Sequence, residues 1–130
     1  MVVWQTRRLA ATYDTLAPDG SEIRLLVQFE RGSLVHCRLR PGQVTRPVRH
    51  RTVEEIWFCV AGAGQVWRKA ADGEEIVDVE AGVALTIPLG VAFQFRASGS
   101  LPLELLITTL PPWPGPDEAV LVDGAWEPTP

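Results

Sequence analysis

The apolar residues of this chain come in short runs, and Gly, Pro or Asp separates each run from the next. No stretch keeps a helical period. Short β-prone runs at regular spacing are typical of an all-β sandwich or barrel. Because Pro47 cannot donate a backbone hydrogen bond, the run around it is expected at a sheet edge or in an irregular position. We predict strands over 23–29, 34–39, 44–50, 55–60, 65–69, 75–79, 83–87, 92–96 and 103–109, with a short one over 119–122.

The length and charge of the chain narrow the function classes. Its 130 residues are about the size of one domain and contain no linker, so we expect a single domain over 1–130. No apolar stretch reaches the ~18 residues of a membrane span, and the N-terminus lacks the order of a signal peptide. We therefore expect a cytoplasmic protein with no membrane partner. A net charge of -4 argues against nucleic-acid binding. Cys37 and Cys59 form no C-x-x-C pair and are expected to be buried, reduced thiols.

The middle of the chain contains two spaced patterns. In the first, Gly42 is followed by five residues, Val48-Arg49-His50, four residues, Glu55, six residues and Gly62. In the second, Gly82 is followed by five residues, Pro88-Leu89-Gly90, two residues, Phe93, three residues and Ala97. The spacing of every Gly and Pro resembles that of the two cupin motifs, G-x5-H-x-H-x3-4-E-x6-G and G-x5-P-x-G-x2-H-x3-N.

The resemblance covers 34–109 and implies a cupin-type barrel, the double-stranded β-helix or jelly roll, with a cavity. N-terminal strands within 1–30 would precede this barrel, and a Pro-rich loop and tail over 110–130 would follow it. Cupin metal sites use two histidines and a glutamate of the first motif and a histidine of the second. Here Val48 and Phe93 replace two of these histidines, and only His50 and Glu55 remain. The resemblance therefore implies the barrel without implying a bound metal.

Strand alternation predicts which side chains share a face. If His50 points inward, Val48 and Arg46 should do so too. If Glu55 points inward, Trp57 and Cys59 should join it. Periodicity alone does not decide the interior face of 34–39, but the resemblance to cupins favours His36 inward. The residues expected to contact a substrate are therefore His36, Arg46, Val48, Trp57 and Phe93.

His50 and Glu55 are the candidate catalytic residues. Burial in an apolar cavity raises the pKa of a carboxyl group towards neutrality, and a nearby histidine can then exchange protons with a substrate. This chemistry suits an isomerase, dehydratase or cyclase that acts on a small molecule, as in some natural-product pathways. The alternative is a buried hydrogen-bonded pair that only orders the barrel, as in a non-catalytic, ligand-binding or sensory cupin.

A metal-dependent lyase or oxygenase is a further alternative. His36, His50 and Glu55 would together supply two nitrogens and one carboxylate, which suits a divalent metal such as Fe, Mn, Ni or Zn. Gln94 could add a weak oxygen ligand if strand twist turned it inward in place of Phe93.

Three expectations concern the surroundings of this site. Arg46 could hold a substrate anion, or it could lie on a solvated face. Trp113 lies in a proline-rich loop that could cover the mouth of the barrel. Ile56, Phe58 and Val60 alternate with further apolar residues, and a barrel of one layer cannot bury both faces of such a strand. We therefore predict a homodimer.

Overall fold

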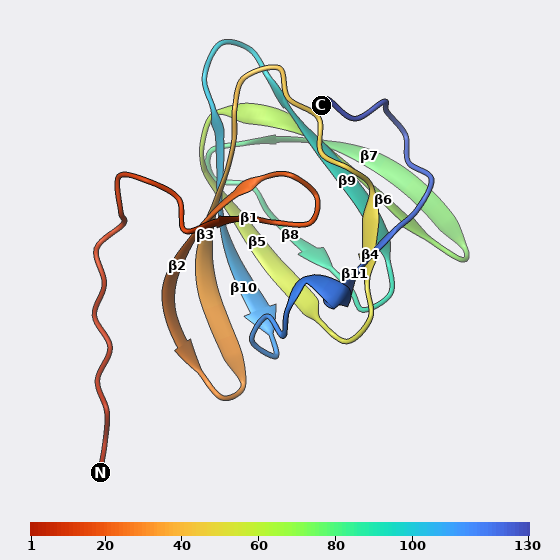
Figure 1. The fold of residues 1–130 in the computed structure, drawn as a ribbon. Coiled ribbons are helices and arrows are strands. Elements are labelled where there is room, and N and C mark those ends of the chain that lie inside the picture. Colours follow the sequence, from red (N-terminus) through yellow and green to blue (C-terminus); the bar gives the residue numbers. More distant parts are fainter.

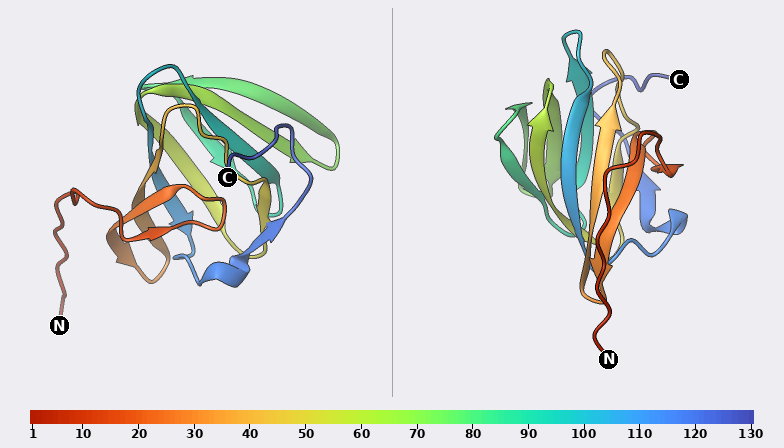
Figure 2. Two further views of the ribbon diagram at one scale, coloured as in Figure 1. Left: turned by 45° about the horizontal axis from the view of Figure 1, so that its top comes forward. Right: turned by 90° about the vertical axis from the view of Figure 1, so that its left-hand side faces the viewer.

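Two antiparallel sheets face each other and enclose the core of the computed structural model, which describes residues 1–130 (Figures 1 and 2). The larger sheet has the strand order β1-β2-β3-β10-β5-β8, and the smaller sheet has the order β11-β4-β9-β6-β7. The larger sheet consists of β1 (Thr15–Leu16), β2 (Glu22–Phe29), β3 (Gly32–Leu39), β5 (Glu54–Ala61), β8 (Ala84–Ile87) and β10 (Leu103–Leu110). The smaller sheet consists of β4 (Val48–His50), β6 (Ala63–Ala70), β7 (Gly73–Glu80), β9 (Ala92–Ser98) and β11 (Ala119–Leu121). This architecture confirms the predicted all-β jelly-roll fold.

Alternation along β5 shows how the sequence separates the two faces of the larger sheet. Glu55, Trp57 and Cys59 are buried, whereas the residues between them are exposed. The buried residues point towards the smaller sheet and join a core formed by both sheets. The prediction that Trp57 and Cys59 share the face of Glu55 is confirmed.

The structure differs from the sequence prediction at two places before β5. The strand predicted over 44–50 is only three residues long, Val48–His50, and Val44 makes an isolated bridge with Arg96. Pro47 explains the interruption because it has no N–H to donate to a neighbouring strand. The N-terminal strands expected within 1–30 begin only at Thr15. The irregular segment before it runs beside β2, where the carbonyl of Ala10 accepts a hydrogen bond from Arg24 and the side chain of Gln5 accepts one from the N–H of Gln28 (Figure 1).

Gly62 allows the chain to turn tightly between β5 and β6. Its φ is +78°, a conformation that L side chains rarely adopt, and a Cβ there would collide with the carbonyl oxygen of Pro102. The motif glycine is therefore required by the close approach of two backbones. It does not take part in the chemistry of the site.

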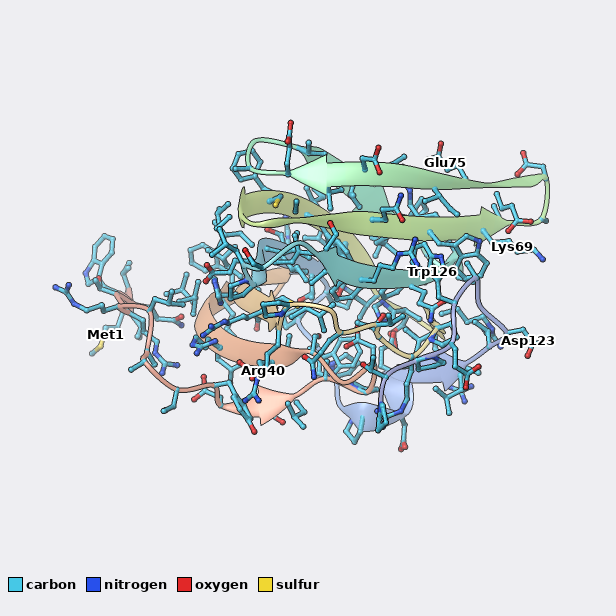
Figure 3. All side chains as sticks on the ribbon, turned by 90° about the horizontal axis from the view of Figure 1, so that it is seen from above. Met1, Arg40, Lys69, Glu75, Asp123 and Trp126 are labelled. Carbon is cyan, nitrogen blue, oxygen red and sulfur yellow. The ribbon has the colours of Figure 1, made fainter.

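The C-terminal segment packs against the smaller sheet. Trp126 stacks under the Arg96 guanidinium, whose carbon lies 4.2 Å from the indole ring centre. Gln94, which is fully buried, donates to the Trp126 carbonyl and accepts hydrogen bonds from the backbone N–H groups of Ala125 and Trp126. Figure 3 shows Trp126 against this sheet, while Met1 projects into solvent at the other side. No helix of the structure has the length and apolar character needed to cross a membrane.

Candidate functional site

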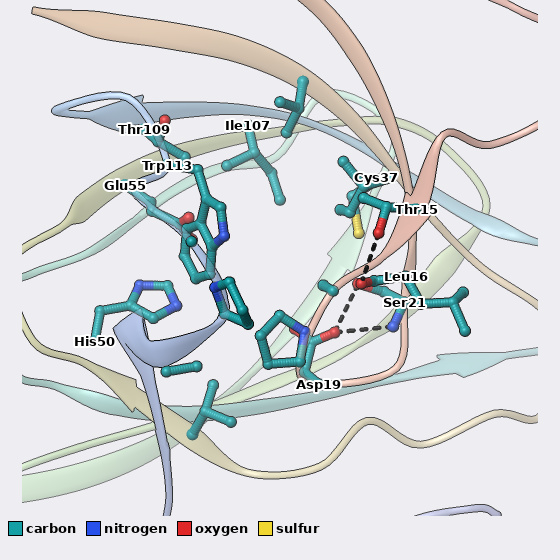
Figure 4. A pocket seen from close by; sticks show the side chains of 18 of the residues that line it. Thr15, Leu16, Asp19, Ser21, Cys37, His50, Glu55, Ile107, Thr109 and Trp113 are labelled. Atoms are coloured by element: carbon teal, nitrogen blue, oxygen red, sulfur yellow. Dashed lines mark hydrogen bonds between the residues drawn. The ribbon is translucent and has the colours of Figure 1, made fainter.

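A cavity of about 430 Å³ lies between the two sheets, near the end where β4 leads into β5. Figure 4 shows the side chains that surround it. Most of its wall is hydrophobic, and both sheets contribute to it. The residues from these sheets include Ile23, Val35, Cys37, Val48, Trp57, Phe93 and Ile107. Two loops complete the wall, one over 17–21 and the other over 111–116. Trp113 lines the cavity from the second loop, where the sequence analysis placed a cover for the barrel.

Glu55 enters the cavity near the start of β5. It is paired with Ile87 on β8 and with Thr109 on β10, so strands on both sides fix its position. The residue is 7% exposed, and the Trp57 indole N–H donates to Oε1 over 3.0 Å. Burial raises the pKa of this carboxyl group to about 7, although the hydrogen bond from Trp57 opposes the shift. Glu55 therefore exchanges its proton in the neutral pH range.

His50 ends β4 and lies against two aromatic rings. The ring centres of Phe93 and Trp113 are each 5.1 Å from that of the imidazole, in edge-to-face geometry. The residue is only 4% exposed, and its buried Nδ1 has no hydrogen-bond partner. Burial lowers the pKa of His50 to about 4, and the charge of Glu118 only partly offsets this effect. The imidazole is therefore neutral at pH 7.

Glu118 connects the loop that carries Trp113 to the turn between His50 and Glu55. Its carboxylate accepts hydrogen bonds from the backbone N–H groups of Thr52 and Val53 and from the Thr52 hydroxyl. Burial acts to raise the pKa of Glu118, but these hydrogen bonds outweigh it and hold the pKa below its ordinary value. This residue stabilises the cover over the cavity, and sequence reasoning missed it because it lies in a proline-rich loop.

Asp19 is a second carboxyl group on the cavity wall that sequence reasoning missed. It lies in the loop between β1 and β2, and its Oδ1 accepts hydrogen bonds from the Ser21 N–H over 2.9 Å and from the Ser21 hydroxyl over 2.7 Å. Burial raises the pKa of Asp19 despite these bonds and despite the charge of Arg46. Pro18-Asp19-Gly20 is a sequence typical of a turn, and no pattern in the sequence relates Asp19 to the interior of the barrel.

A comparison with known protein families decides the family. The model of the Cupin domain matches residues 35–109, which is more than half of the chain. The chain belongs to the cupin family. This match covers the strands and turns that hold His50 and Glu55.

The individual proteins that resemble this chain share 30% or less of its sequence in the examples below. The xanthan biosynthesis protein XanB of Xanthomonas campestris is 30% identical over 91 residues, which cover 70% of this cupin but 19% of XanB. The uncharacterized protein MJ1618 of Methanocaldococcus jannaschii is 29% identical over 118 residues, 84% of this cupin and 91% of the relative. A mutant of Bacillus subtilis oxalate decarboxylase OxdC superposes with a TM-score of 0.78 at 20% identity, covering 94% of this chain and 33% of that one. The cupin therefore spans only a part of XanB and OxdC, and the likeness to OxdC shows the fold alone.

The prediction that His36 points into this cupin's cavity is wrong. Val35 and Cys37 line the cavity instead, so the alternation of β3 turns His36 to the outer face of the sheet. There its Nε2 lies 3.0 Å from Oε1 of Glu104 on the neighbouring strand. Periodicity left the inner face of this strand open, and the family resemblance favoured the wrong one.

Two other predicted positions also need correction. Arg46 is exposed, lies outside the cavity and donates to the carbonyl of Pro18 over 3.3 Å. The alternation that linked it to His50 stops at Pro47. Gln94 faces away from the cavity and holds the C-terminal segment, so it cannot serve as an oxygen ligand there.

The remaining predicted residues surround the cavity as expected. Val48 and Phe93 are a directly opposed pair on β4 and β9 and are 1% and 2% exposed. Trp57 packs its ring against Phe93 with ring centres 5.5 Å apart. These three side chains form an apolar wall next to His50 and Glu55.

The residues present do not fit a metal ion of the kind that many cupins hold. No group of three or more His, Cys, Asp or Glu side chains comes together in a way that could bind one. The ligand set His36, His50 and Glu55 is wrong because His36 lies on the other face of its sheet. Val48 and Phe93 stand where the motif has two further histidines, and they offer no donor atom.

Proposed function

We propose that this cupin transfers protons on a compact, largely apolar organic molecule, such as a secondary metabolite, with Glu55 and His50 as its catalytic residues. The observation that carries the proposal is that both side chains line one apolar cavity, where burial raises the pKa of the Glu55 carboxyl group to about 7 and keeps the His50 imidazole neutral. A base whose pKa lies near the working pH combines a populated ionised form with a useful driving force. The proposal covers isomerases, dehydratases and cyclases that proceed through an enol or enolate.

The two residues have different tasks. The Glu55 carboxylate removes a proton from a carbon next to a carbonyl, and the electron pair of the broken C–H bond forms the C=C bond of an enolate. The neutral His50 imidazole donates its N–H to the oxygen on which the negative charge develops, as a neutral histidine can in a water-poor site. The Glu55 carboxyl group then returns the proton to the same or to a neighbouring carbon. The reaction therefore needs no oxidant, reductant or other co-reactant.

The walls of the cavity support this division of tasks. Phe93 and Trp113 pack on the edges of His50 and hold its ring in place. Trp57 does the same for Glu55 through its indole N–H. Groups held by packing keep the geometry that proton transfer requires, and an apolar wall strengthens each electrostatic interaction inside it.

The similarity to XanB raises a carbohydrate as an alternative substrate, since that protein is named for xanthan biosynthesis. A sugar needs a polar partner for most of its hydroxyl groups. The wall of this cavity is mostly hydrophobic, so it fits a molecule with few polar groups better.

Hydrogen exchange on a neutral ketone tests the proposal. We suggest 2-tetralone in D2O, with the loss of its α-hydrogens followed by NMR. We expect the wild type to accelerate exchange, with a rate that rises as the pH passes through about 7. Glu55→Gln should lower the enzymatic rate by about a hundredfold or more. Glu54→Gln is the matched control, because Glu54 is exposed on the outer face of the same strand.

A second candidate function is ligand binding without turnover. The hydrogen bond from Trp57 to Glu55 favours it, because the same bond could serve only to order the barrel. Quenching of tryptophan fluorescence by 2-tetralone distinguishes the two functions. Binding without accelerated exchange in the wild type supports the sensory function. Exchange that is lost in Glu55→Gln while binding persists supports catalysis. Equal exchange rates in the wild type and Glu55→Gln would contradict the catalytic role.

A further inference from the structure

We infer that the cavity selects molecules that present an O–H or N–H donor to Asp19, and that it rejects anions. This inference names the substrate class of the site described above and so rests on the proposed function. It makes Asp19 a residue that determines specificity, at some distance from the reacting atoms.

The polar groups of the cavity wall lie at two separate places. Figure 4 shows Asp19, Ser21 and Cys37 at one side of the cavity, and His50, Glu55 and Trp113 at the other. A bound molecule can therefore meet the proton-transfer residues at one end and the Asp19 carboxyl group at the other. The space between these ends is bordered by hydrophobic side chains.

One carboxyl oxygen of Asp19 is free to accept a hydrogen bond from a ligand. Both hydrogen bonds from Ser21 reach the same oxygen, Oδ1. Oδ2 accepts no hydrogen bond within the protein, so it keeps its capacity for a donor from a ligand. The carboxyl group is held by the loop and needs little rearrangement to bind one. Cys37, which lies beside it, is no nucleophile, because burial and then the charge of Asp19 raise the pKa of its thiol.

The cavity wall has acidic residues but no basic side chain to balance them. Asp19 and Glu55 are its acidic residues, and no arginine or lysine lines the cavity. The negative charge of Asp19 adds to the burial that raises the pKa of Glu55, so the two carboxyl groups interact across the space. An anionic ligand would bring a further negative charge into an apolar environment without a cation to pair with it. Arg46, the cation expected here, is exposed outside the cavity.

His50 is a second group on the cavity wall that has no partner within the protein. It is 4% exposed and lines the cavity, and its side chain makes no hydrogen bond. Its unpaired Nδ1 does not by itself identify a ligand, because Nδ1 of His36 on the outer face is also buried without a partner.

A matched series of tetralones tests the inference by binding alone. The probes are 6-hydroxy-2-tetralone, 6-amino-2-tetralone and 2-tetralone-6-carboxylate, with unsubstituted 2-tetralone as the reference. Quenching of the tryptophan fluorescence gives each dissociation constant. We expect the hydroxyl and amino compounds to bind the wild type at least about tenfold more tightly than the carboxylate. Whichever of the hydroxyl and amino compounds loses more affinity in Asp19→Asn has the substituent that is the better hydrogen-bond donor to Asp19.

Asp19→Asn keeps an oxygen for Ser21 and removes the negative charge. We expect this variant to bring the affinities of the hydroxyl and carboxylate compounds to within about threefold of each other. Asp123→Asn is the matched control, because Asp123 is exposed and makes no side-chain hydrogen bond. Circular dichroism checks that both variants fold. Tight binding of the carboxylate by the wild type, or an unchanged ratio in folded Asp19→Asn, would overturn the inference.

These outcomes are separable from those of the proposed function. If selectivity depends on Asp19 while 2-tetralone exchange does not depend on Glu55, the substrate class stands and the catalytic role fails. If exchange depends on Glu55 while the carboxylate compound binds best, the catalytic role stands and the substrate class fails.

Discussion

His36 and His50 are buried to the same extent, at 3% and 4% exposure, but only His50 faces the cavity between the sheets. His36 lies on the outer face of the larger sheet, where Glu104 contacts its Nε2 and opposes the effect of burial on its pKa. His50 lies on the cavity wall between two aromatic rings, where no carboxylate reaches it within hydrogen-bond distance. Nδ1 of each imidazole is buried without a hydrogen-bond partner. The two residues differ in their surroundings, because His36 is paired through Nε2 with Glu104 on the outer face, whereas His50 lines the cavity and makes no hydrogen bond.

The same contrast holds for carboxyl groups. On the outer face, Glu22 lies 3.0 Å from Nε of Arg40 and 4.0 Å from an Arg24 guanidinium nitrogen. On the inner face, Glu55 has only the neutral indole of Trp57 as a partner. Glu22 therefore has two cations within 4.0 Å, whereas the only side-chain hydrogen bond to Glu55 comes from a neutral group. The following predictions test this difference in order of decreasing effect on the protein.

The largest effect is expected from the aromatic residues of β5, which alternate between the two faces. Trp57 is 1% exposed and packs on Phe93 and Phe95, whereas Phe58 is 44% exposed. Trp57→Ala should lower the free energy of unfolding by about 3–5 kcal/mol, because it leaves a cavity in the core. Phe58→Ala should cost less than about 1 kcal/mol. Urea unfolding of both variants measures the difference. Equal losses would mean that the faces of β5 are assigned wrongly.

The second effect concerns the uncompensated charge of Glu55 and depends on pH. Folding raises its pKa from the ordinary value of 4.5 to about 7. The contribution of Glu55 to the stability of the folded wild type is therefore fully present below the pKa that this residue has in the unfolded chain. It is lost as the pH rises through about 7. Glu55→Gln does not ionise. We expect its stability relative to the wild type to increase by about 3 kcal/mol between about pH 4 and about pH 8.

Unfolding curves of the wild type and Glu55→Gln across this range test the sign as well as the size. Glu54→Gln, on the exposed side of the strand, should show no comparable dependence on pH. His50 acts in the opposite sense, because folding lowers its pKa from 6.5 to about 4. Its contribution to stability is therefore lost as the pH falls from about 6.5 to about 4. If the difference in the free energy of unfolding between Glu55→Gln and the wild type stayed constant with pH, folding would not shift the pKa of Glu55, and the prediction would be wrong.

The sequence predicted the inner face correctly where strands were regular. The motif spacing placed His50, Glu55, Val48 and Phe93, and strict alternation along β5 then placed Trp57. The predictions that failed lie where alternation is interrupted or ambiguous. Pro47 ends the alternation before Arg46, and β3 has apolar and polar residues whose order does not reveal which set faces inward.

The two carboxyl groups contributed by loops could not be predicted from the sequence. Asp19 lies in the turn between β1 and β2, and Glu118 ends a short 3-10 helix, Pro116–Glu118, after the proline-rich loop; in neither place does a period relate a side chain to the core. Their positions depend on contacts with residues far away in the chain, such as the bonds from Thr52 and Val53 to Glu118. Only the folded structure brings these loops to the cavity, so the roles of Asp19 and Glu118 could not be predicted from the sequence.

A smaller effect is expected from the ion pair of the outer face. Glu104→Gln removes the charge beside His36 and leaves a neutral acceptor in its place. It should cost about 1 kcal/mol near pH 6 and lower the pKa of His36 further, because Glu104 is the group that raises it. NMR titration of the two imidazoles measures both pKa values. The pKa of His50 should not change, and a change of equal size in both histidines would contradict the separation of the two faces.

The smallest effect on the protomer is expected from a change that tests its assembly. Ile56, Phe58 and Val60 expose 49%, 44% and 39% of their surface on the outer face of β5, where the predicted homodimer could bury them. We propose that this stripe forms the dimer interface. Phe58→Glu should then give monomers at micromolar concentration while changing the stability of the protomer by less than about 1 kcal/mol. Light scattering gives the mass of both proteins, with Glu54→Gln as the control on the same face. A wild type of one chain's mass would contradict the dimer, and a dimeric Phe58→Glu would move the interface away from β5.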